Sequence, residues 1–200
     1  MKRMVVGVSG ASGIVLAYKL LRVLAEKGYH IDCVMSKHAL YAASLEMGKE
    51  YASSAKFIEP LNTVTVHSNQ DVGCSICSGS FPSLGMVIIP CSMGTVAAIA
   101  CGLADNALRR AADVTLKERR PLVIVPRECP LSSLHLENLL RLSNLGATIV
   151  PPIPAWYTQP KSVDDIENFI VGRVLDALKI DHALYPRWGE DQLSSIFAAH

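Results

Sequence analysis

Apolar positions along the chain alternate between short continuous runs and longer stretches with helical spacing. The first run, from Arg3 to Val8, is rich in valine and is followed at once by glycines, a pattern typical of a strand buried on both faces of a parallel sheet. Similar runs predict strands at 29–35, 61–67, 85–90, 122–125 and 147–150. Between them, helical spacing and capping residues predict helices at 12–27, 36–47, 95–101, 105–119, 132–146 and 162–180. Residues 48–60 show no regular pattern.

The alternation of strands and helices predicts one doubly wound α/β domain with a parallel sheet and right-handed crossovers. We expect this domain to span residues 1–180, followed by a C-terminal tail at 181–200. Half of the residues are hydrophobic and only 18% are charged, which is more apolar surface than one small domain usually covers. We therefore expect contacts between subunits, with the tail packing on neighbouring copies.

Charge and composition exclude several classes of protein. The net charge is +1 and the lysines and arginines are scattered, unlike the basic stripe of a nucleic-acid-binding protein. Residues 72–104 carry no charge, but their prolines and glycines favour a buried strand, a turn and a helix over a membrane span. The first residues are too short for a secretory signal. We expect a cytoplasmic protein whose six cysteines are free thiols.

Cys74 and Cys77 form a C-x-x-C motif. No second C-x-x-C or histidine pair completes a zinc site, and the six histidines show no metal-ligand spacing. Two interpretations stay open: metal or redox use of the pair, and a chance spacing in a loop.

Small residues follow the first strand and open the first helix, at Gly7-Val8-Ser9-Gly10-Ala11-Ser12-Gly13. Small side chains let the backbone approach a phosphate, and a helix N-terminus offers unpaired N–H groups. The spacing is neither the G-x-G-x-x-G of dinucleotide sites nor a P-loop. The motif predicts phosphate binding; the alternative is a tight turn without a ligand.

The second strand ends in Met35-Ser36, whereas a site for NAD usually has an acidic residue there. Asp32 lies inside the strand, and Ser36 is either a ligand contact or only a helix cap. Pro90-Cys91-Ser92-Met93-Gly94-Thr95 repeats the strand–turn–helix design after the fourth strand. Two phosphate-type turns without the acidic residue predict a mononucleotide such as FMN; the alternative for the second is again a tight turn.

Three further features carry candidate chemistry. Arg127 and Glu128 follow the fifth strand, where they suit a flavin carbonyl and proton transfer; the alternative is a surface ion pair. Arg173 falls within an apolar stripe of the last helix, where a bound phosphate would compensate its charge; the alternatives are an arginine reaching outward or pairing at a subunit contact. Trp156 and Tyr157 line either a ligand pocket or an oligomer contact.

In their order along the chain, these motifs resemble the UbiX/Pad-type flavin prenyltransferases, within the flavin-containing cysteine-decarboxylase-like group. Besides the two turns, the resemblance rests on Ala104-Asp105-Asn106, Arg110-Ala111-Ala112-Asp113, Leu116-Lys117-Glu118-Arg119-Arg120-Pro121-Leu122, Pro126-Arg127-Glu128, Leu142-Ser143-Asn144-Leu145-Gly146-Ala147 and Pro186-Arg187-Trp188-Gly189. It covers about the whole chain.

The resemblance implies a flavodoxin-like or Rossmann-like three-layer α/β/α subunit in a homo-oligomer, commonly a dodecamer. It implies transfer of a dimethylallyl group from dimethylallyl monophosphate to N5 and C6 of reduced FMN, without a metal. The prenylated FMN then serves a UbiD-type decarboxylase, often in quinone biosynthesis.

The resemblance also assigns residues. For FMN binding it implies Gly10, Ala11, Ser12, Ser36, Ser92, Met93, Gly94, Thr95 and Arg127. For the prenyl phosphate it implies Tyr157 and Arg173, with Arg110 and Lys117 reaching in from a neighbouring subunit. For catalysis it implies Glu128 as the acid/base residue, with Ser78 and Glu46 near the reacting centre.

Two other functions fit a flavin site on this fold. A peptidyl-cysteine decarboxylase usually relies on a histidine early in the first helix, and the stretch 14–18 has none. A carrier that only delivers flavin would not need the cations at 110, 117 and 173. Both features favour prenyl transfer.

Overall fold

The computed structural model describes residues 2–59 and 61–189. Its chain divides into two compact units, and the boundary along the chain falls between Pro152 and Ile153. The first unit contains the sheet, and the second contains the last long helix. The expected domain boundary at residue 180 stays a prediction, and residues 190–200 of the expected tail lie outside the described residues.

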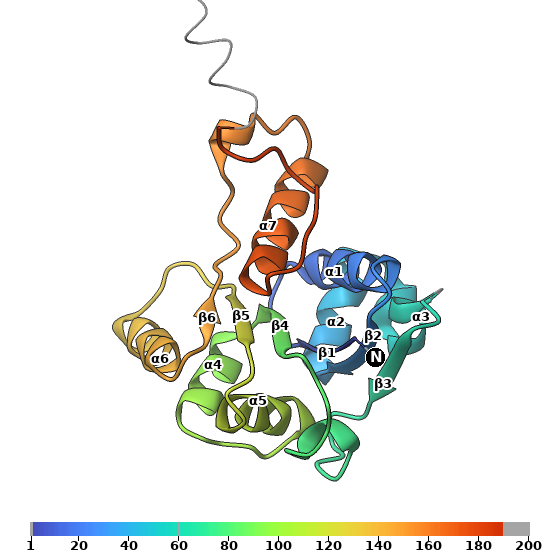
Figure 1. Ribbon diagram of the computed structural model, residues 1–200, viewed down its shortest axis with the longest axis vertical. Helices are drawn as coiled ribbons and strands as arrows, with labels where there is room; N and C mark the ends of the chain where they lie inside the picture. Colours follow the sequence, from blue (N-terminus) through green and yellow to red (C-terminus); the bar gives the residue numbers. More distant parts are fainter. Residues whose placement is uncertain (1, 60, 190–200) are drawn as a thin grey trace, which may run out of the picture. The chain divides into compact units, whose positions relative to one another are not determined.

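Within the described residues, six parallel strands form one sheet in the order β3-β2-β1-β4-β5-β6 (Figure 1). The strands are β1 (Arg3–Val8), β2 (His30–Met35), β3 (Val64–His67), β4 (Met86–Cys91), β5 (Leu122–Pro126) and β6 (Thr148–Ile149). This order belongs to the doubly wound Rossmann arrangement, which reverses between β1 and β4. The predicted α/β class and parallel sheet are confirmed.

Helices connect the strands on both faces of the sheet. In the first unit they are α1 (Ile14–Glu26), α2 (Lys37–Glu46), α3 (Ser54–Ile58), α4 (Met93–Ala100), α5 (Ala107–Lys117) and α6 (Ser133–Asn144). Figure 1 shows α1 and α5 on opposite sides of the strands. The part of the chain that the structure describes also contains three short 3₁₀ helices: η1 (Lys49–Ala52), η2 (Ser75–Cys77) and η3 (Trp156–Thr158).

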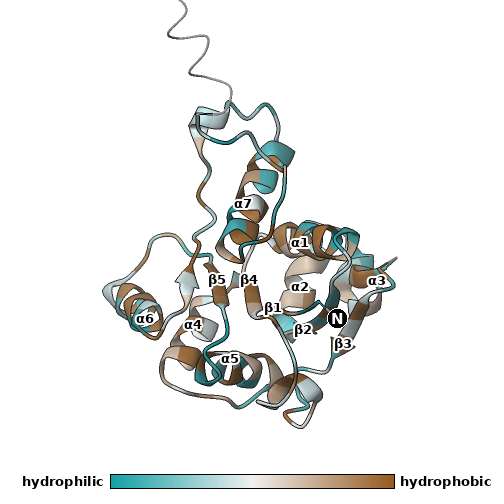
Figure 2. Cartoon of the chain, viewed as in Figure 1, coloured by the Kyte–Doolittle hydropathy of each residue, from teal (hydrophilic) through white to brown (hydrophobic). Residues whose placement is uncertain are grey.

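The central strands are apolar because helices cover both of their faces. All six residues of β4 and all five of β5 are buried, and Figure 2 colours both strands as hydrophobic. Val5, Met86 and Ile88 face a cluster that includes Val96 of α4 and Leu108 of α5. Full burial of each such side chain contributes about 1.5–3 kcal/mol, so the sheet provides a rigid support for the loops at its edge.

Capping serines fix the start of most of the described helices. The caps at Ser36, Ser132 and Ser162 were predicted from the sequence. The cap at Ser92 was not, and α4 begins at Met93 instead of the predicted residue 95. Ser36, Ser92 and Ser132 each accept a hydrogen bond from a backbone N–H of the helix they precede. Residues 48–60 were expected to be irregular, and that expectation is wrong. They contain η1 and α3, which are too short to show helical periodicity, although Phe57 is fully buried and meets the Tyr18 ring edge-on at 5.7 Å.

Asp32 is buried in the middle of β2, as the sequence indicates. Its Oδ1 lies 2.8 Å from His67 Nε2, and its Oδ2 lies 3.4 Å from Arg3 Nε. The histidine ring nitrogen and the arginine are the polar partners of a carboxylate that is only 2% exposed. Asp32 therefore serves the sheet and is not placed at a strand end to hold a ribose.

The second unit is built around α7 (Val163–Ala177), which Ser162 caps in a reciprocal capping box with Asp165. Residues after the helix fold back onto it: the space beside Gly172 is filled by the Tyr185 and His182 side chains. Among the described residues, no helix has both the length and the apolarity needed to cross a bilayer.

Candidate functional site

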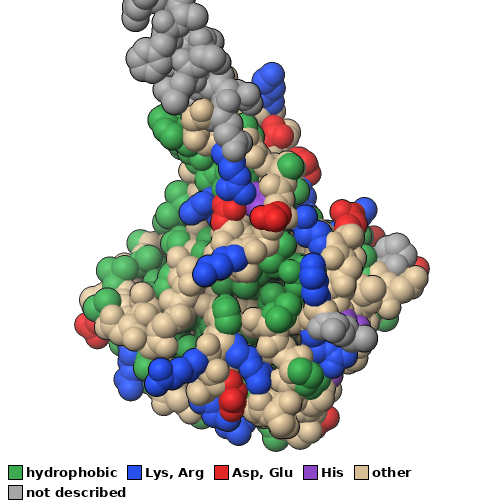
Figure 3. All heavy atoms as spheres, in the orientation of Figure 1, with side chains coloured by type: hydrophobic (Ala, Val, Ile, Leu, Met, Phe, Trp, Pro, Cys, Tyr) green, Lys and Arg blue, Asp and Glu red, His purple; other side chains and the backbone are tan. Residues whose placement is uncertain are grey.

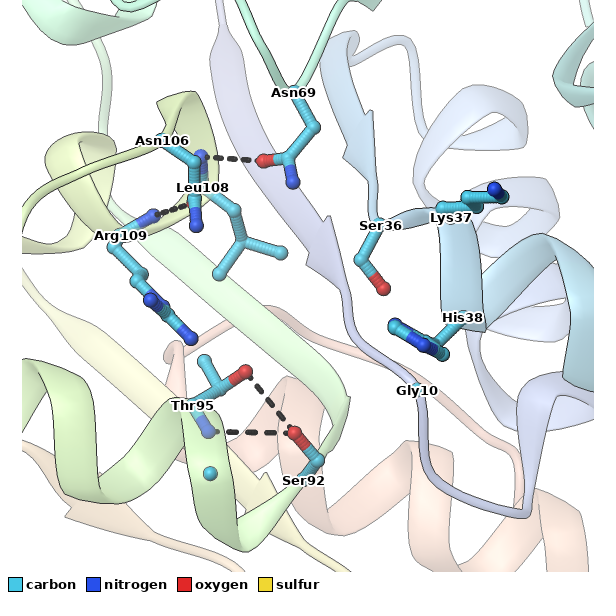
Figure 4. A pocket seen from close by; sticks show the side chains of 11 residues that line it. Gly10, Ser36, Lys37, His38, Asn69, Ser92, Thr95, Asn106, Leu108 and Arg109 are labelled. Carbon is cyan, nitrogen blue, oxygen red and sulfur yellow. Dashed lines mark hydrogen bonds between the residues drawn. The ribbon is translucent and has the colours of Figure 1, made fainter.

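A cavity of about 290 Å³ lies in the first unit at the carboxyl edge of the sheet. Its lining residues follow four neighbouring strands (Figure 4): Gly10, Ser36, Lys37, His38, Asn69, Ser92, Gly94, Thr95, Asn106, Leu108 and Arg109. The cavity sits where the strand order reverses, which is the usual place for a ligand in a doubly wound sheet.

Two helix N-termini meet at this cavity. Ser36 and Ser92 cap α2 and α4, with side-chain oxygens 3.1 Å from Ala39 N and 3.3 Å from Thr95 N. The first N–H groups of a helix have no acceptor within the helix, so the amides just after each cap remain available. Together with the positive ends of two helix dipoles, they favour an anion.

Side chains add hydroxyls and positive charge to these amides. Thr95 Oγ1 lies 3.0 Å from Ser92 Oγ, and Figure 4 shows Arg109 extending toward Thr95 from the opposite wall, with Lys37 and His38 across the cavity. Arg109 is held by Asp105, whose Oδ1 lies 2.7 Å from its Nη1. Hydroxyls, amides and a guanidinium together match the donors that phosphate groups accept from.

Ser9 fixes the distance between the two turns, and sequence reasoning did not single it out as a site residue. It is 2% exposed; its Oγ accepts from Ser92 N at 2.7 Å and lies 3.3 Å from the Pro90 carbonyl oxygen. Gly10 allows another close approach, because a Cβ there would lie 2.4 Å from His38 Cβ. The loop after β1 is thus held against both helix starts.

The N-terminus of α1 is occupied by a carboxylate of the chain itself. Glu46 accepts from Gly13 N at 3.1 Å and from Ile14 N at 2.8 Å. The expectation that the first helix offers unpaired N–H groups to a phosphate is therefore wrong for these two amides. The predicted catalytic role of Glu46 stays a prediction; in this structure it caps α1.

The cavity includes five of the nine residues predicted for FMN binding: Gly10, Ser36, Ser92, Gly94 and Thr95. Ala11 and Met93 are buried beside it, at 8% and 7% exposure, and Ser12 is exposed. Arg127 is exposed beyond the end of β5, where its N–H donates to the Cys91 carbonyl at 3.1 Å. These four residues do not line the cavity, so their roles remain predictions.

Asn69 and Asn106 line the cavity although sequence reasoning did not propose them. Asn69 Oδ1 accepts from Leu108 N and Asn106 Oδ1 accepts from Arg109 N, both at 3.0 Å, so the two asparagines hold the start of α5. Asn69 comes two residues after β3. Its position just beyond a strand is the signal that could have found it, had the third strand been treated like the first, second and fourth.

A second group of predicted residues lies on and beside α5, away from the cavity lining. Arg110 pairs with Asp113 at 2.8 Å, and Lys117 pairs with Glu118. Ser78 is exposed, and a Cβ on the next residue, Gly79, would lie 2.7 Å from Lys117 Nζ. The structure therefore brings the backbone directly after Ser78 close to the Lys117 ammonium.

The remaining predicted residue in the first unit is Glu128. It is exposed after β5, with Oε1 accepting from Cys129 N at 3.0 Å. It comes directly after Arg127, at the same edge of the sheet as the end of β4.

Tyr157 and Arg173 belong to the second unit. The Tyr157 ring meets Phe169 and Trp188 edge-on, with centroids 6.2 and 4.9 Å away. The Arg173 side chain is 53% exposed and pairs with Asp176 at 2.9 Å. Of the interpretations left open for Arg173, the structure shows an arginine that reaches outward to an ion-pair partner one turn along. Its apolar surroundings therefore do not by themselves indicate a phosphate, and its predicted role toward the prenyl donor stays a prediction.

Asp176 organises the polar contacts of the second unit. Burial opposes its ionisation, but hydrogen bonds from Tyr185, Arg187 and His182 lower the pKa of Asp176 to about 2. The carboxylate thereby ties α7 to the segment after it.

Among the described residues, no group of three histidine, cysteine or acidic side chains is placed to hold a metal ion. The donors of the cavity are amides, hydroxyls and cations, which suit a phosphate.

Comparison with known proteins gives these features a family context. The model of the flavoprotein family matches residues 1–175. Flavin prenyltransferase UbiX of Chlamydia pneumoniae is 49% identical over 192 residues, covering 96% of this chain and all of that protein. The enzyme of the same name from Methanocaldococcus jannaschii is 45% identical, with 94% of this chain and 98% of the relative covered.

Solved structures agree with the sequence comparison. AnUbiX in complex with FMN and dimethylallyl pyrophosphate superposes with a TM-score of 0.89 at 39% identity, covering 94% of this chain and 97% of that one. A dodecameric FMN-dependent UbiX-like decarboxylase from Escherichia coli O157:H7 gives 0.87 at 44% identity, covering 93% and 98%. The peptidyl-cysteine decarboxylase EpiD gives 0.62 at 13% identity, which is a likeness of fold alone.

Proposed function

The chain belongs to the UbiX-type flavin prenyltransferases, within the flavoprotein family, and from that membership we propose how it makes prenylated FMN. The acceptor is reduced FMN, and the donor is dimethylallyl monophosphate. The dimethylallyl group joins N5 and C6 of the flavin without the help of a metal ion.

The observation that carries this proposal is the meeting of two capped helix starts at one cavity. The hydroxyls of Ser36, Ser92 and Thr95, the amides after the caps and the cation of Arg109 suit the phosphate of FMN. Gly94 leaves the wall open, since a Cβ there would meet nothing within 4 Å. Bound and reduced, FMN would supply the electron-rich nitrogen and carbon that accept the prenyl group.

We assign the donor phosphate to Arg110, Lys117, Tyr157 and Arg173, and the flavin to Arg127. Breaking the allylic C–O bond concentrates negative charge on the leaving phosphate, and preorganised cations stabilise that charge as it develops. Arg110 and Lys117 do not line the cavity of their own subunit, and their recorded ion-pair partners among the described residues are Asp113 and Glu118. This placement supports their action at the site of a neighbouring subunit.

Glu128 is our candidate for the group that moves protons, and Ser78 and Glu46 are candidates for contacts near the reacting atoms. Replacing Glu128 with Gln keeps the shape of the side chain and removes its capacity to accept a proton. We expect E128Q to stall after the first carbon–nitrogen bond. The singly attached flavin has the same mass as the ring-closed product and is distinguished from it by its absorption spectrum. Unchanged turnover would remove Glu128 from the mechanism.

Assembly into a homo-oligomer, with a dodecamer as the expected size, is part of the proposal. The α6 helix buries only Leu142 fully, whereas Leu134, Leu136 and Leu140 are more than half exposed. Apolar side chains are also visible between the charged ones on the face in Figure 3. A dodecameric relative at 44% identity supports coverage of such surfaces by other subunits.

The product is proposed to serve a UbiD-type decarboxylase in the cytoplasm. The free cysteines of the described chain suit a reducing compartment.

The test is to incubate the purified protein with reduced FMN and dimethylallyl monophosphate under anaerobic conditions and to measure the mass of the released flavin. A prenylated flavin is the expected product, with dimethylallyl diphosphate as a comparison donor and a chelator present to test metal independence. Unmodified FMN would favour a carrier. Oxidative decarboxylation of a peptide ending in cysteine would favour the decarboxylase activity of the distant structural relatives.

A further inference from the structure

Cys74 and Cys77, the C-x-x-C pair, lie at the two ends of one tight turn. Cys77 N donates to the Cys74 carbonyl at 3.0 Å, which closes the turn that contains η2. A closed turn of this kind brings its first and fourth Cα atoms within about 7 Å, close to the usual range for disulfides. The sulfurs are 3.6 Å apart, so a short approach of the two side chains would bring them to bonding distance.

The two thiols differ in accessibility. Cys77 is 7% exposed within the apolar cluster, and its Sγ is 3.7 Å from the Ala107 carbonyl oxygen. Burial, reinforced by the hydrogen bond with Cys74, raises the pKa of Cys77 to about 12. Cys74 is only half-buried. An oxidant therefore reaches Cys74 first, and Cys77 is the thiol held next to it.

The other cysteines lack such a partner arrangement. Cys33 and Cys91 are buried, and burial raises the pKa of each thiol to about 12. Cys101 and Cys129 are exposed, and among the described residues the recorded sulfur–sulfur contact is that between Cys74 and Cys77. Selective oxidation of this pair is the chemical consequence.

We propose that Cys74 and Cys77 form a reversible redox site, which a low-molecular-weight disulfide such as oxidised glutathione converts into an intramolecular disulfide. The Cys74 thiolate attacks one sulfur of glutathione disulfide, forming a mixed disulfide and releasing one glutathione. The Cys77 sulfur, on losing its proton, attacks Cys74 and releases the second. Two protein thiols are oxidised, one glutathione disulfide is reduced to two thiols, and the two cysteine protons pass to them.

Oxidation would alter the residues beside the turn. Ser78 follows Cys77 directly, and the Arg110 charge acts to lower the pKa of Cys77 against the larger effect of burial. Drawing Cys77 toward Cys74 removes its contact with the Ala107 carbonyl in the first turn of α5. Resting on the proposed function, which gives Arg110 and Ser78 roles in using the prenyl donor, the disulfide should weaken donor use and leave FMN binding intact.

The first test follows the bond itself. The purified protein is equilibrated with mixtures of oxidised and reduced glutathione, free thiols are alkylated after denaturation, and peptides are mapped by mass. We expect a Cys74–Cys77 disulfide that reduced glutathione reverses. C77S should trap glutathione on Cys74, C74S should leave Cys77 unmodified, and C101S should behave as the wild type. Modification of Cys101 and Cys129 with the pair still reduced, or glutathione on Cys74 of the wild type without ring closure, would overturn the proposal.

The second test separates the proposed redox site from the proposed prenyl transfer. We expect the oxidised protein to show a KM for dimethylallyl monophosphate raised severalfold, an FMN dissociation constant within about twofold, and no such change for C74S after the same treatment. A disulfide that leaves the donor KM unchanged would refute the effect on catalysis. If the disulfide forms on oxidation but the reduced protein prenylates no FMN, the proposed function is refuted and the redox site remains supported.

Discussion

Replacing Gly94 with alanine should raise stability and lower FMN affinity at the same time. Gly94 lies in the first turn of α4, where a Cβ would meet nothing within 4 Å, and its φ is not among the positive ones. Alanine is favoured over glycine in a helix by roughly 0.5–1 kcal/mol. For a chain of this size that corresponds to a rise in melting temperature of about 1–4 °C.

The same methyl group occupies space at the wall of the cavity. An added methyl in a packed site costs about 1–3 kcal/mol, so FMN should bind roughly 5- to 150-fold more weakly. Thermal denaturation without ligand and fluorescence titration with FMN measure the two effects. A97G on the same helix is the matched control, because Ala97 is half-buried and absent from the cavity lining; it should lower the melting temperature and retain FMN affinity. Full FMN affinity in G94A would refute the placement of the flavin.

Three further changes test other parts of the structure. S9A removes the acceptor of Ser92 N–H and should lower the free energy of unfolding by about 1–3 kcal/mol in urea titrations. An unchanged free energy of unfolding would contradict this expectation and would mean that water replaces the lost acceptor. D176N should destabilise the second unit by on the order of 2 kcal/mol at pH 7. Because the folded pKa of Asp176 is depressed to about 2, its stabilisation is complete above about pH 4 and is lost toward pH 2. The fluorescence of Trp156 and Trp188, both in this unit, should therefore show the wild type and D176N converging over that range, and a constant gap would contradict the assignment. L140E should dissociate the oligomer in light-scattering measurements while L140M preserves it, and an intact L140E assembly would exclude α6 from the contact.

Much of the fold was predictable because its signals are local. The valine-rich strands, the capping serines at 36, 132 and 162 and the glycines that end helices each act over a few residues. The segment 48–60 was missed because α3 has only five residues, and its order depends on the contact between Phe57 and Tyr18.

The site was predictable only in part, because some of its contacts join residues that are far apart in the sequence. The hydroxyls of Ser36, Ser92 and Thr95 come from strand-turn-helix motifs that can be read in one segment. Ser9 and Asn69 act on partners 83 and 39 residues away, and helical spacing placed Arg173 on an apolar face without showing that Asp176 draws it outward. Partners distant in sequence have no local pattern.

The carboxylate of Glu46 at the start of α1 has a consequence for which nucleotides the protein tolerates. In dinucleotide-binding sheets of this strand order, the pyrophosphate rests on the N-terminus of the first helix. Here that position already holds a negative charge bonded to Gly13 and Ile14, and a pyrophosphate would meet repulsion instead of free amides. We therefore expect a scaffold of the dehydrogenase type to disfavour NAD and NADP here, and to bind the shorter flavin nucleotide instead.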